Sequence, residues 1–329
     1  MTWIIKGTDL SVYLLLLIAV VYFYYFRKSL EWQRLKKILL SKKRYKIALI
    51  ILFFYAGIGF LDCIHLKTEK ALSVLDYLMP SGVYLPEKTY SAPSFSDHLL
   101  GTDKVGRDIF YMTIKSIRTG LIIGTITSLF MLPFALLFGL LSGYFRGWLD
   151  DCIQYLYTTL SAIPGVLLIA ACMLCFQTTI ELDADFRLLM LCMILGLTSW
   201  TNLCRLIRAE TLKLREAEFI QNAIGMAVSN RRILLCHILP NLMHIVLITV
   251  VLDFSGLVLA ETILSYVGVG VDPTTYSWGN LINASRLELA REPIVWWPLA
   301  GALVPLFFLV FSVNLVSDAI QEALNPRVV

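Results

Sequence analysis

The sequence predicts an all-α polytopic membrane protein with about seven transmembrane helices. Hydrophobic residues make up 58% of the 329 residues and charged residues only 16%, with a mean hydropathy of +0.73. This composition is too apolar for a soluble domain of such length. Seven apolar runs are long enough to cross the roughly 30 Å hydrocarbon core of a bilayer, and basic residues gather in the loops between some of them.

The apolar runs give candidate spans near 9–26, 46–63, 119–143, 153–176, 187–204, 242–264 and 296–316. The first run is short, and it ends in aromatic residues, as is typical where a helix meets lipid headgroups. A cleaved signal peptide is the alternative, but the basic residues gather after this run and no A-x-A cleavage pattern occurs. We therefore expect a retained anchor.

Basic residues predict the orientation. The loop after the first run contains one acidic residue, Glu31, and nine basic ones, namely Arg27, Lys28, Arg34, Lys36, Lys37, Lys42, Lys43, Arg44 and Lys46. The positive-inside rule makes this loop cytoplasmic. The amino terminus and the 64–118 loop are then expected outside, and the 205–241 loop and the carboxyl terminus inside. The 205–241 loop also has a basic excess, so the net charge of +4 indicates membrane orientation and no nucleic-acid partner.

Several enzyme motifs are absent. The sequence has no GxxxxGK[ST] phosphate loop, no HExxH zinc helix and no GxSxG nucleophile elbow, and its four histidines are not spaced as metal ligands. We assign no catalytic residue, cofactor or metal to this chain, so any ATP hydrolysis must come from a partner. The seven cysteines lie mostly in or beside apolar runs and are expected to be buried free thiols.

The segment EFIQNAIGMAVSNRRILLCHILPN, residues 218–241, is the most informative loop. It predicts an amphipathic helix pair that ends in Pro240, which opens the next span without losing a hydrogen bond. The apolar side chains Phe219, Ile220, Ile224 and Met226 would form a rigid knob suited to a partner's groove. The alternative is a connector lying on the membrane surface.

Five sequence blocks occur in a fixed order. They are HLLGTDKVGRD at 98–108, GYFRGWLDD at 143–151, the loop ending HILPN at 237–241, ETILSYVGVGVDPTTYSWG at 261–279 and NLVSDAIQEALNPR at 314–327. With these blocks, residues 95–327 resemble the C-type inner-membrane permease subunits of oligopeptide/dipeptide (binding-protein-dependent) ABC transporters.

The resemblance implies a permease subunit and not an enzyme. It implies a six-helix core, to which this chain adds one amino-terminal helix, in a bacterial or archaeal cytoplasmic (inner) membrane. Residues 1–45 would form the anchor and a basic cytoplasmic loop, 46–118 the first core helix and an external loop, and 119–329 the permease core. The implied partners are a homologous second permease, two ATP-binding subunits, an extracytoplasmic solute-binding protein and the lipid bilayer. The implied solutes are peptides or similar small molecules.

The same resemblance identifies 205–241 as the loop that couples to the ATPase. Its candidate residues are Glu218, Gln221, Asn222, Ala223, Ala227, Arg232, His237, Pro240 and Asn241. A gapless alignment back from HILPN places the family's Glu-Ala-Ala on residues 221–223 and its glycine on Ala227. Gln221 is uncharged, so a family ion pair at that position would be replaced by a neutral hydrogen bond.

Asp253 is the candidate residue of the translocation path, because it lies near the middle of the 242–264 span, where an ionisable group is costly. A structural hydrogen bond to a neighbouring helix is an equal alternative. Glu261 is expected to be structural. Glycines 120, 124, 139 and 143 predict close helix packing, and Pro133 and Pro164 predict kinks.

Two other function classes were weighed. A secondary transporter or channel would need no ATPase, but would usually show repeated halves or several intramembrane charges. A membrane-embedded enzyme would need acid, base or metal residues near Asp253, and no His or Cys stands at that depth.

Overall fold

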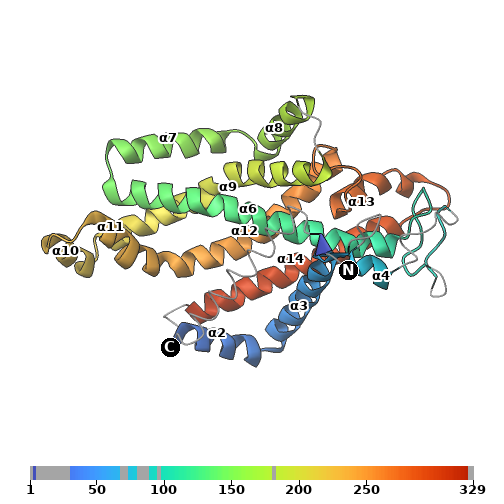
Figure 1. Ribbon diagram of the computed structural model, residues 1–329. Coiled ribbons are helices and arrows are strands. Elements are labelled where there is room, and N and C mark those ends of the chain that lie inside the picture. The colour runs from blue at the N-terminus through green and yellow to red at the C-terminus, as the bar shows by residue number, and fades with distance from the viewer. Residues whose placement is uncertain are drawn as a thin grey trace.

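A computed structural model describes residues 3–4, 30–66, 73–79, 89–94, 98–179 and 183–324, and most of them are helical. The elements are β1 (Trp3–Ile4), α2 (Leu30–Ser41), α3 (Lys43–Cys63), β2 (His65–Leu66), α4 (Val74–Leu78), α6 (Ile109–Phe145), α7 (Trp148–Ala162), α8 (Gly165–Thr179), α9 (Ala184–Arg215), α10 (Glu218–Gly225), α11 (Asn230–Arg232), a π-helical segment (Ile233–Ile238), α12 (Leu239–Val267), α13 (Trp278–Ser285), a 3-10 turn (Glu288–Ala290) and α14 (Trp297–Leu324) (Figure 1).

Five long apolar helical segments can each cross a membrane. They are Lys43–Asp62, Ile109–Phe145, Ala184–Arg215, Asn230–Val267 and Trp297–Ala323. This confirms the all-α polytopic membrane class. The expected number of seven spans is not reached among the described residues, and the expected span at 9–26 lies outside them.

The expected span at 153–176 is sharply bent, at the proline where a kink was expected. The chain forms two helices there, α7 and α8, which meet at 86°. The break falls at Pro164, which has no amide proton to donate and pushes the preceding residue out of the helical region. Ile163 accordingly has extended backbone angles, φ −88° and ψ 131°. If the pair is counted as one broken span, the described part of the chain has six spans; as a re-entrant loop, it leaves five.

Three helices extend beyond their apolar runs. Helix α6 begins at Ile109, because the Asp108 side chain accepts hydrogen bonds from the Phe110 and Tyr111 amides and caps the helix. Helix α9 continues to Arg215, and residues 230–241, which were expected in a loop, join α12 in one helical run. The connecting loop of 205–241 therefore shrinks to α10 and its flanking turns.

Glycines allow α6 and α9 to pack closely. A Cβ atom at Gly139 would lie 2.7 Å from Ile207, and one at Gly143 would lie 2.6 Å from Thr211. Distances this short leave no room for a side chain, so the helix backbones approach as small-residue motifs permit. The Phe254 ring occupies the space beside Gly124 in the same way. These glycines serve packing within the chain.

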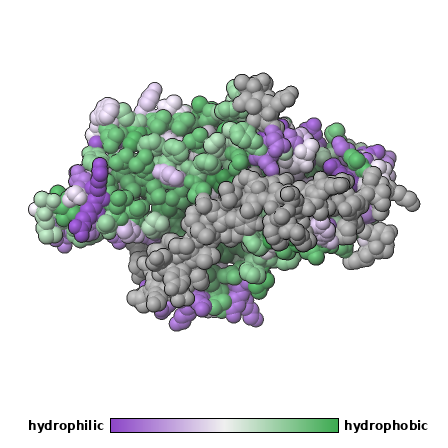
Figure 2. Space-filling view, in the orientation of Figure 1, coloured by the Kyte–Doolittle hydropathy of each residue, from purple (hydrophilic) through white to green (hydrophobic). Residues whose placement is uncertain are grey.

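The long helices run side by side between two ends of the molecule (Figure 1). At one end lie α10, α11, α2 and the last turns of α14; we call it the α10 end. At the other lie α4, α13 and the start of α14; we call it the α13 end. Figure 2 shows hydrophobic residues over the middle of the visible face and hydrophilic residues towards the two ends, as expected for a protein whose solvent is a bilayer.

Candidate functional site

Helix α10 forms the tip of the α10 end (Figure 1). One side of α10 is anchored in the protein, because Ile220 is fully buried and Ala223 is 5% exposed in a core shared with α6, α7, α9 and α12. The sequence grouped Ile220 with an exposed apolar knob, and this was wrong: a helix of two turns needs one apolar face for the core.

On either side of this buried face, and just after the helix, α10 exposes apolar side chains. Phe219 is 48% exposed, Ile224 40% and Met226 74%. These three residues, which we call the α10 patch, stand beyond the ends of the spanning helices and beside charged groups. Exposed apolar side chains on a helix that is anchored by its buried side are suited to bind in a groove of a partner protein.

The predicted coupling residues fall into two groups. Glu218, Gln221, Asn222 and Ala227 are exposed on α10 and its following turn, whereas Ala223 is buried. The others belong to the helical run into α12, where Arg232, Pro240 and Asn241 are exposed and His237 is partly buried. The structure therefore brings the first group together around the α10 patch and separates the second from it along the helix.

Gln221 does not extend towards a partner. Its Nε2 atom donates a hydrogen bond of 2.8 Å to the main-chain oxygen of Arg215, at the end of α9. The residue at the family's glutamate position thus ties α10 to the helix before it. Any contact of this exposed side chain with another protein would have to compete with that bond.

Helix α10 ends in a Schellman motif. The Ala227 amide donates to Ile224 O and the Val228 amide to Ala223 O, at 3.0 and 3.1 Å. The motif puts Ala227 in the left-handed region, with φ 55°. This is where the resemblance places a glycine, so the structure retains the conformation that a glycine would favour.

A π-helical segment leads from α11 into α12. The Leu239 amide donates to Leu234 O, five residues back. Pro240 follows and has no amide proton, and the Asn241 Nδ2 atom donates to His237 O at 2.6 Å. Pro240 was expected to open a new helix after a break. It does lie in the first turn of α12, but no break precedes it, because the π segment joins α11 and α12 in one continuous helical run.

Polar contacts join the helices that surround α10. Arg208 on α9 donates to both carboxylate oxygens of Asp150 on α7, at 2.6 and 2.7 Å. Tyr144 on α6 donates to Asn230 Oδ1 at 2.9 Å, and the Arg215 guanidinium lies 5.7 Å from the Tyr144 ring centre. Sequence reasoning missed these pairs, although Asp150 stands in the GYFRGWLDD block.

Asp253 lies midway along α12 and is half-buried. Its Oδ2 atom is buried and has no hydrogen-bond partner among the described residues. The structural hydrogen bond that was the alternative role is thus not formed by that atom within this part of the chain. Beside it, Leu252, Gly256, Leu259 and Ile263 form an exposed stripe, since residues three and four apart share a helix face.

Glu261, by contrast, is 1% exposed and has a partner within its own helix. The Ser265 hydroxyl donates to Glu261 Oε1 at 2.7 Å, and the Val271 amide donates to Ser265 Oγ. These bonds fold the 268–277 turn back onto α12. The expected structural role of Glu261 fits this geometry.

The 98–108 block is a compact turn at the α13 end. Asp103 accepts from the Val105 and Arg107 amides and from Arg107 Nε, and the Trp297 indole donates to Thr102 O at 3.0 Å. The block therefore joins the start of α6 to the start of α14.

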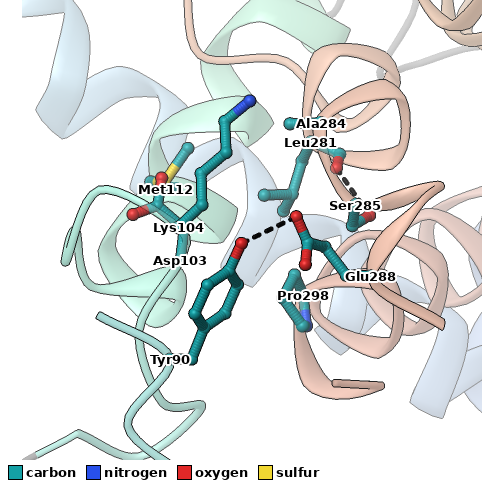
Figure 3. Close-up of a pocket in the computed structure, with 9 residues that line it drawn as sticks. All are labelled: Tyr90, Asp103, Lys104, Met112, Leu281, Ala284, Ser285, Glu288 and Pro298. Atoms are coloured by element: carbon teal, nitrogen blue, oxygen red, sulfur yellow. Dashed lines mark hydrogen bonds between the residues drawn. The ribbon is translucent and has the colours of Figure 1, made fainter. Parts of the chain in front are cut away.

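A small pocket opens beside this turn (Figure 3). Tyr90 donates to Glu288 Oε1 at 2.8 Å, and Arg291 lies over the Tyr90 ring at 4.2 Å. Burial and then the Glu288 carboxylate raise the pKa of Tyr90. The cavity volume of about 10 Å³ holds about one water molecule. It is too small to be a solute site, and the Tyr90–Glu288 hydrogen bond holds Tyr90 against the turn that follows α13.

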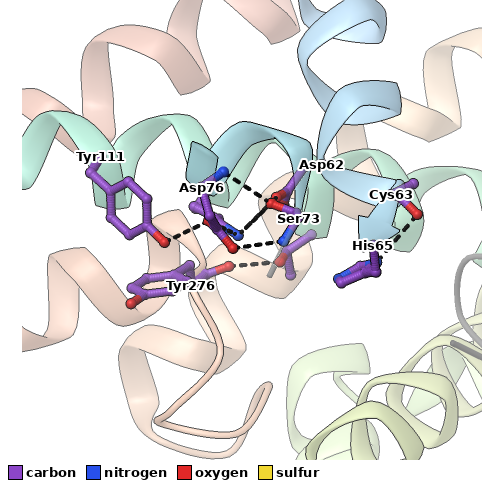
Figure 4. Close-up of polar contacts among 9 residues, drawn as sticks. Asp62, Cys63, His65, Ser73, Asp76, Tyr111 and Tyr276 are labelled. Carbon is purple, nitrogen blue, oxygen red and sulfur yellow. Dashed lines mark hydrogen bonds and ion pairs between the residues drawn. The ribbon is translucent and has the colours of Figure 1, made fainter. Parts of the chain in front are cut away.

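A buried polar cluster joins α3, α4 and α6 (Figure 4). The Lys115 Nζ atom lies 2.8 Å from Asp62 Oδ1 and 2.6 Å from Asp76 Oδ1, and the Tyr111 hydroxyl donates to Asp76 at 2.8 Å. Burial opposes ionisation of Asp76, but Lys115, the Ser73 amide and Tyr111 outweigh it and lower the pKa of Asp76. Sequence reasoning did not predict this cluster, because its two acids lie before the resembling blocks.

The cysteines are free thiols. Cys63, Cys192 and Cys204 are buried and Cys172 is partly buried, but Cys152, Cys175 and Cys236 are exposed. The expectation of burial was thus wrong for three of them, which lie at surfaces of this chain. Cys172 and Cys175 stand in a C-x-x-C spacing on α8, which sequence reasoning overlooked. No group of three His, Cys, Asp or Glu residues in the described part of the chain is placed to hold a metal ion.

Comparisons with known proteins agree with this architecture. The model of a family described as the inner membrane component of binding-protein-dependent transport systems matches residues 135–329. An oligopeptide transport system permease protein, OppC, of Mycobacterium tuberculosis is 32% identical over 234 residues, 71% of this chain and 77% of the relative. OppC of Haemophilus influenzae is 30% identical over 70% of both chains, and a putative peptide permease of Brucella suis is 31% identical over 72% and 75%. The chain therefore belongs to the family of inner membrane components of binding-protein-dependent transport systems.

Proposed function

We propose that this chain is a permease subunit of an ATP-driven importer. It pairs with a homologous permease, forms half of the translocation path for peptides or similar small solutes, and is driven by two separate ATP-binding subunits that dock at the α10 end. The names of its relatives, which are peptide permeases, support the solute class.

The α10 patch is the observation that carries the proposal. Phe219, Ile224 and Met226 are exposed beyond the spans on a helix whose other face is buried. An uncovered apolar surface on a fixed element favours a permanent protein partner over water. The ATP-binding subunit would receive α10 in a groove.

The contacts among the helices around α10 would transmit a movement of α10 to the spanning helices. Asp150 and Arg208 hold α7 to α9, and Asn230, which bonds Tyr144, begins the helical run that reaches Val267. A displacement of α10 would thus move α6, α9 and α12 as packed bodies, as in other rigid-body transitions. Closure of the ATP-binding subunits would supply that displacement.

The path itself would pass Asp253. Its buried oxygen has no hydrogen-bond partner among the described residues, and the exposed stripe beside it is a face of α12 that they leave uncovered. A carboxylate there would attract the amino group of a peptide as it passes. The second permease would enclose the same face from the other side.

The basic loops support the sidedness. The α10 end carries the basic α2 and the basic residues of 205–241, which the positive-inside rule assigns to the cytoplasm. The α13 end would then face the extracytoplasmic solute-binding protein, with the amino terminus outside and the carboxyl terminus in the cytoplasm of a bacterium or archaeon.

Co-purification tests this function. The tagged full-length chain is purified in mild detergent, and its companions are identified by mass spectrometry. The variant Ile224→Glu/Met226→Glu is compared with a matched control at the α13 end, Leu287→Glu/Ile294→Glu, whose side chains are 72% and 60% exposed. We expect the wild type and the control to retain a second permease and ATP-binding subunits, and the α10 variant to lose only the latter.

Transport supplies the second readout. Proteoliposomes with the complete complex should take up a short peptide only with ATP, and the α10 variant should not. If the chain purifies alone and still transports without ATP, the importer model fails and a secondary transporter or channel takes its place. If ATP-binding subunits remain bound to the α10 variant, the docking site is elsewhere.

A further inference from the structure

Helix α2 is a basic helix joined directly to a spanning helix. Residues 34–46 contain seven basic residues, and residues 32–61 contain no acidic one. Helix α2 ends at Ser41, and α3 begins at Lys43 after a single residue with extended backbone, Lys42. This segment also lies before the region that the family model matches, 135–329, so nothing in that match explains it.

The position of α2 at the membrane boundary follows from α3. Ile50, Phe53 and Phe54 on α3 are 67%, 77% and 63% exposed, which marks a lipid-facing surface that begins just after Lys46. Because a helix rises 1.5 Å per residue, Lys36 and Lys37 lie within roughly 10 Å of Lys42 along the chain. That is about one Debye length at physiological ionic strength, so the charges of α2 act on the adjacent headgroups.

The orientation of α2 leaves its basic groups uncovered. Helix α2 packs on α14 and α3, with Leu35, Ile38 and Leu39 half-buried. The side chains of Arg34, Lys36, Lys37, Lys43 and Lys46 are exposed and form no ion pair with any described residue. Lys42 is the exception, because it bonds Glu322 on α14 at 2.5 Å, and this pair fixes the α2–α3 corner to the end of α14.

We propose that α2 and the first turn of α3 form a binding surface for anionic phospholipid headgroups. Clusters of Lys and Arg next to a spanning helix attract negatively charged lipids in this way. The half-buried leucine and isoleucine face keeps the helix on the protein, and the exposed lysines hold phosphate groups on the membrane face at which α2 lies. The lipid would thereby brace the corner between α2, α3 and α14.

Lipid retention tests the proposal on the full-length chain. The protein is purified in mild detergent with mixed phosphatidylcholine and phosphatidylglycerol, and the bound lipids are measured by mass spectrometry. The variant Lys36→Gln/Lys37→Gln should retain about 25-fold less phosphatidylglycerol, since each of the two basic side chains near an anionic surface contributes on the order of a fivefold factor. Phosphatidylcholine retention should not change.

The control removes equal charge at the opposite end. Lys104→Gln/Arg286→Gln takes two exposed basic groups from the α13 end and should retain phosphatidylglycerol like the wild type. Lys36→Arg/Lys37→Arg, which keeps the charge, should do the same. Raising the salt concentration should weaken retention by the wild type, because exposed charges are screened.

Three results would overturn the proposal. Equal phosphatidylglycerol retention by the α2 variant and the wild type would show that the lysines do not bind lipid. Unchanged lipid but loss of a co-purified subunit would make α2 a protein interface. Equal loss in the control would show that only overall charge matters. None of these readouts depends on transport, so the proposed function can fail independently.

Discussion

Arg208 holds Asp150 in a bidentate pair, with Nε and Nη2 donating to the two carboxylate oxygens at 2.6 and 2.7 Å. The pair joins α7 to α9 at the base of α10, and Asp150 is 7% exposed. Removing one partner leaves the other charge partly buried without compensation, so we expect Asp150→Ala to destabilise the protein by about 3 kcal/mol. Thermal unfolding in detergent measures this loss.

A double-mutant cycle supplies the control for this pair. If the contact accounts for the effect, Asp150→Ala/Arg208→Ala should cost clearly less than the sum of the two single substitutions. Arg208→Lys should be costly as well, because an ammonium group cannot reproduce the bidentate geometry. Strict additivity would show that the two residues act independently.

Lys115 makes the stability of the α13 end depend on pH in a defined direction. The pKa of Asp76 is lowered in the folded protein, so this carboxylate stabilises the fold at neutral pH. The contribution is present above the unfolded pKa of about 3.9 and is lost as the pH falls through the lower folded pKa. The wild type should therefore lose stability only below about pH 4.

Replacing Lys115 should reverse that dependence. Lys115→Met leaves Asp62 and Asp76 buried without their cation, at a cost of about 3 kcal/mol near neutral pH. Burial would then raise the pKa of Asp76 above its usual value, so acidification towards about pH 5 should increase the melting temperature of this variant. Lys104→Met, an exposed substitution at the same end, should not change the pH dependence. A flat profile for Lys115→Met would contradict the ion-pair account.

Ala227 occupies a conformation that favours glycine. With φ 55°, its Cβ atom meets the following carbonyl oxygen, at a cost of roughly 1 kcal/mol, whereas glycine adopts this region freely. Ala227→Gly should therefore stabilise the protein by up to about 1 kcal/mol, and Ala227→Val should destabilise it. Gly225→Ala is the converse substitution, two residues earlier. Gly225 is helical and has open space around it, so an alanine there should also stabilise the protein.

Among the described residues, the apolar runs predicted which segments are apolar enough to cross the membrane, because transfer into a bilayer depends on composition along the chain. They could not predict where the helices end. Helix α6 begins at Ile109 because of the Asp108 cap, and the π segment before Pro240 joins α12 to α11 in a helical run that starts at Asn230. Pro164 bends α7 and α8 by 86°, whereas Pro133 remains inside α6. Hydropathy does not distinguish these two prolines.

The candidate site likewise has features that the sequence predicted and features that it could not predict. The sequence predicted a helix where α10 lies, and the alignment from HILPN placed a glycine of the family at Ala227, which the structure shows in the left-handed region. The burial of Ile220 and the pairing of Asp150 with Arg208 could not, because they depend on helices that are distant in sequence. The Lys115 cluster could not be predicted either, because its acids come from α3 and α4, which are distant from Lys115 in sequence.

Asp253 gives the prediction that separates a transport role from a packing role. Its Oδ2 atom is buried without a hydrogen-bond partner in the described part of the chain, so the charge stabilises nothing there. Asp253→Asn removes the cost of a buried unpaired charge while keeping the size of the side chain. We expect this variant to be as stable as the wild type or more stable.

Transport by Asp253→Asn should nevertheless fall. If the carboxylate attracts the amino group of a passing peptide, uptake of a lysine-containing peptide should drop by about tenfold, the effect of losing one ion contact of roughly 1.4 kcal/mol. Uptake of an amino-terminally acetylated peptide without lysine should be much less affected, and ATP hydrolysis by the complex should remain. Ser255→Ala, two residues away, offers a control, because this hydroxyl bonds Leu252 O and Asn314 and faces other helices. Equal losses for both peptides, accompanied by a lower melting temperature, would make Asp253 a packing residue whose partner lies on the second permease.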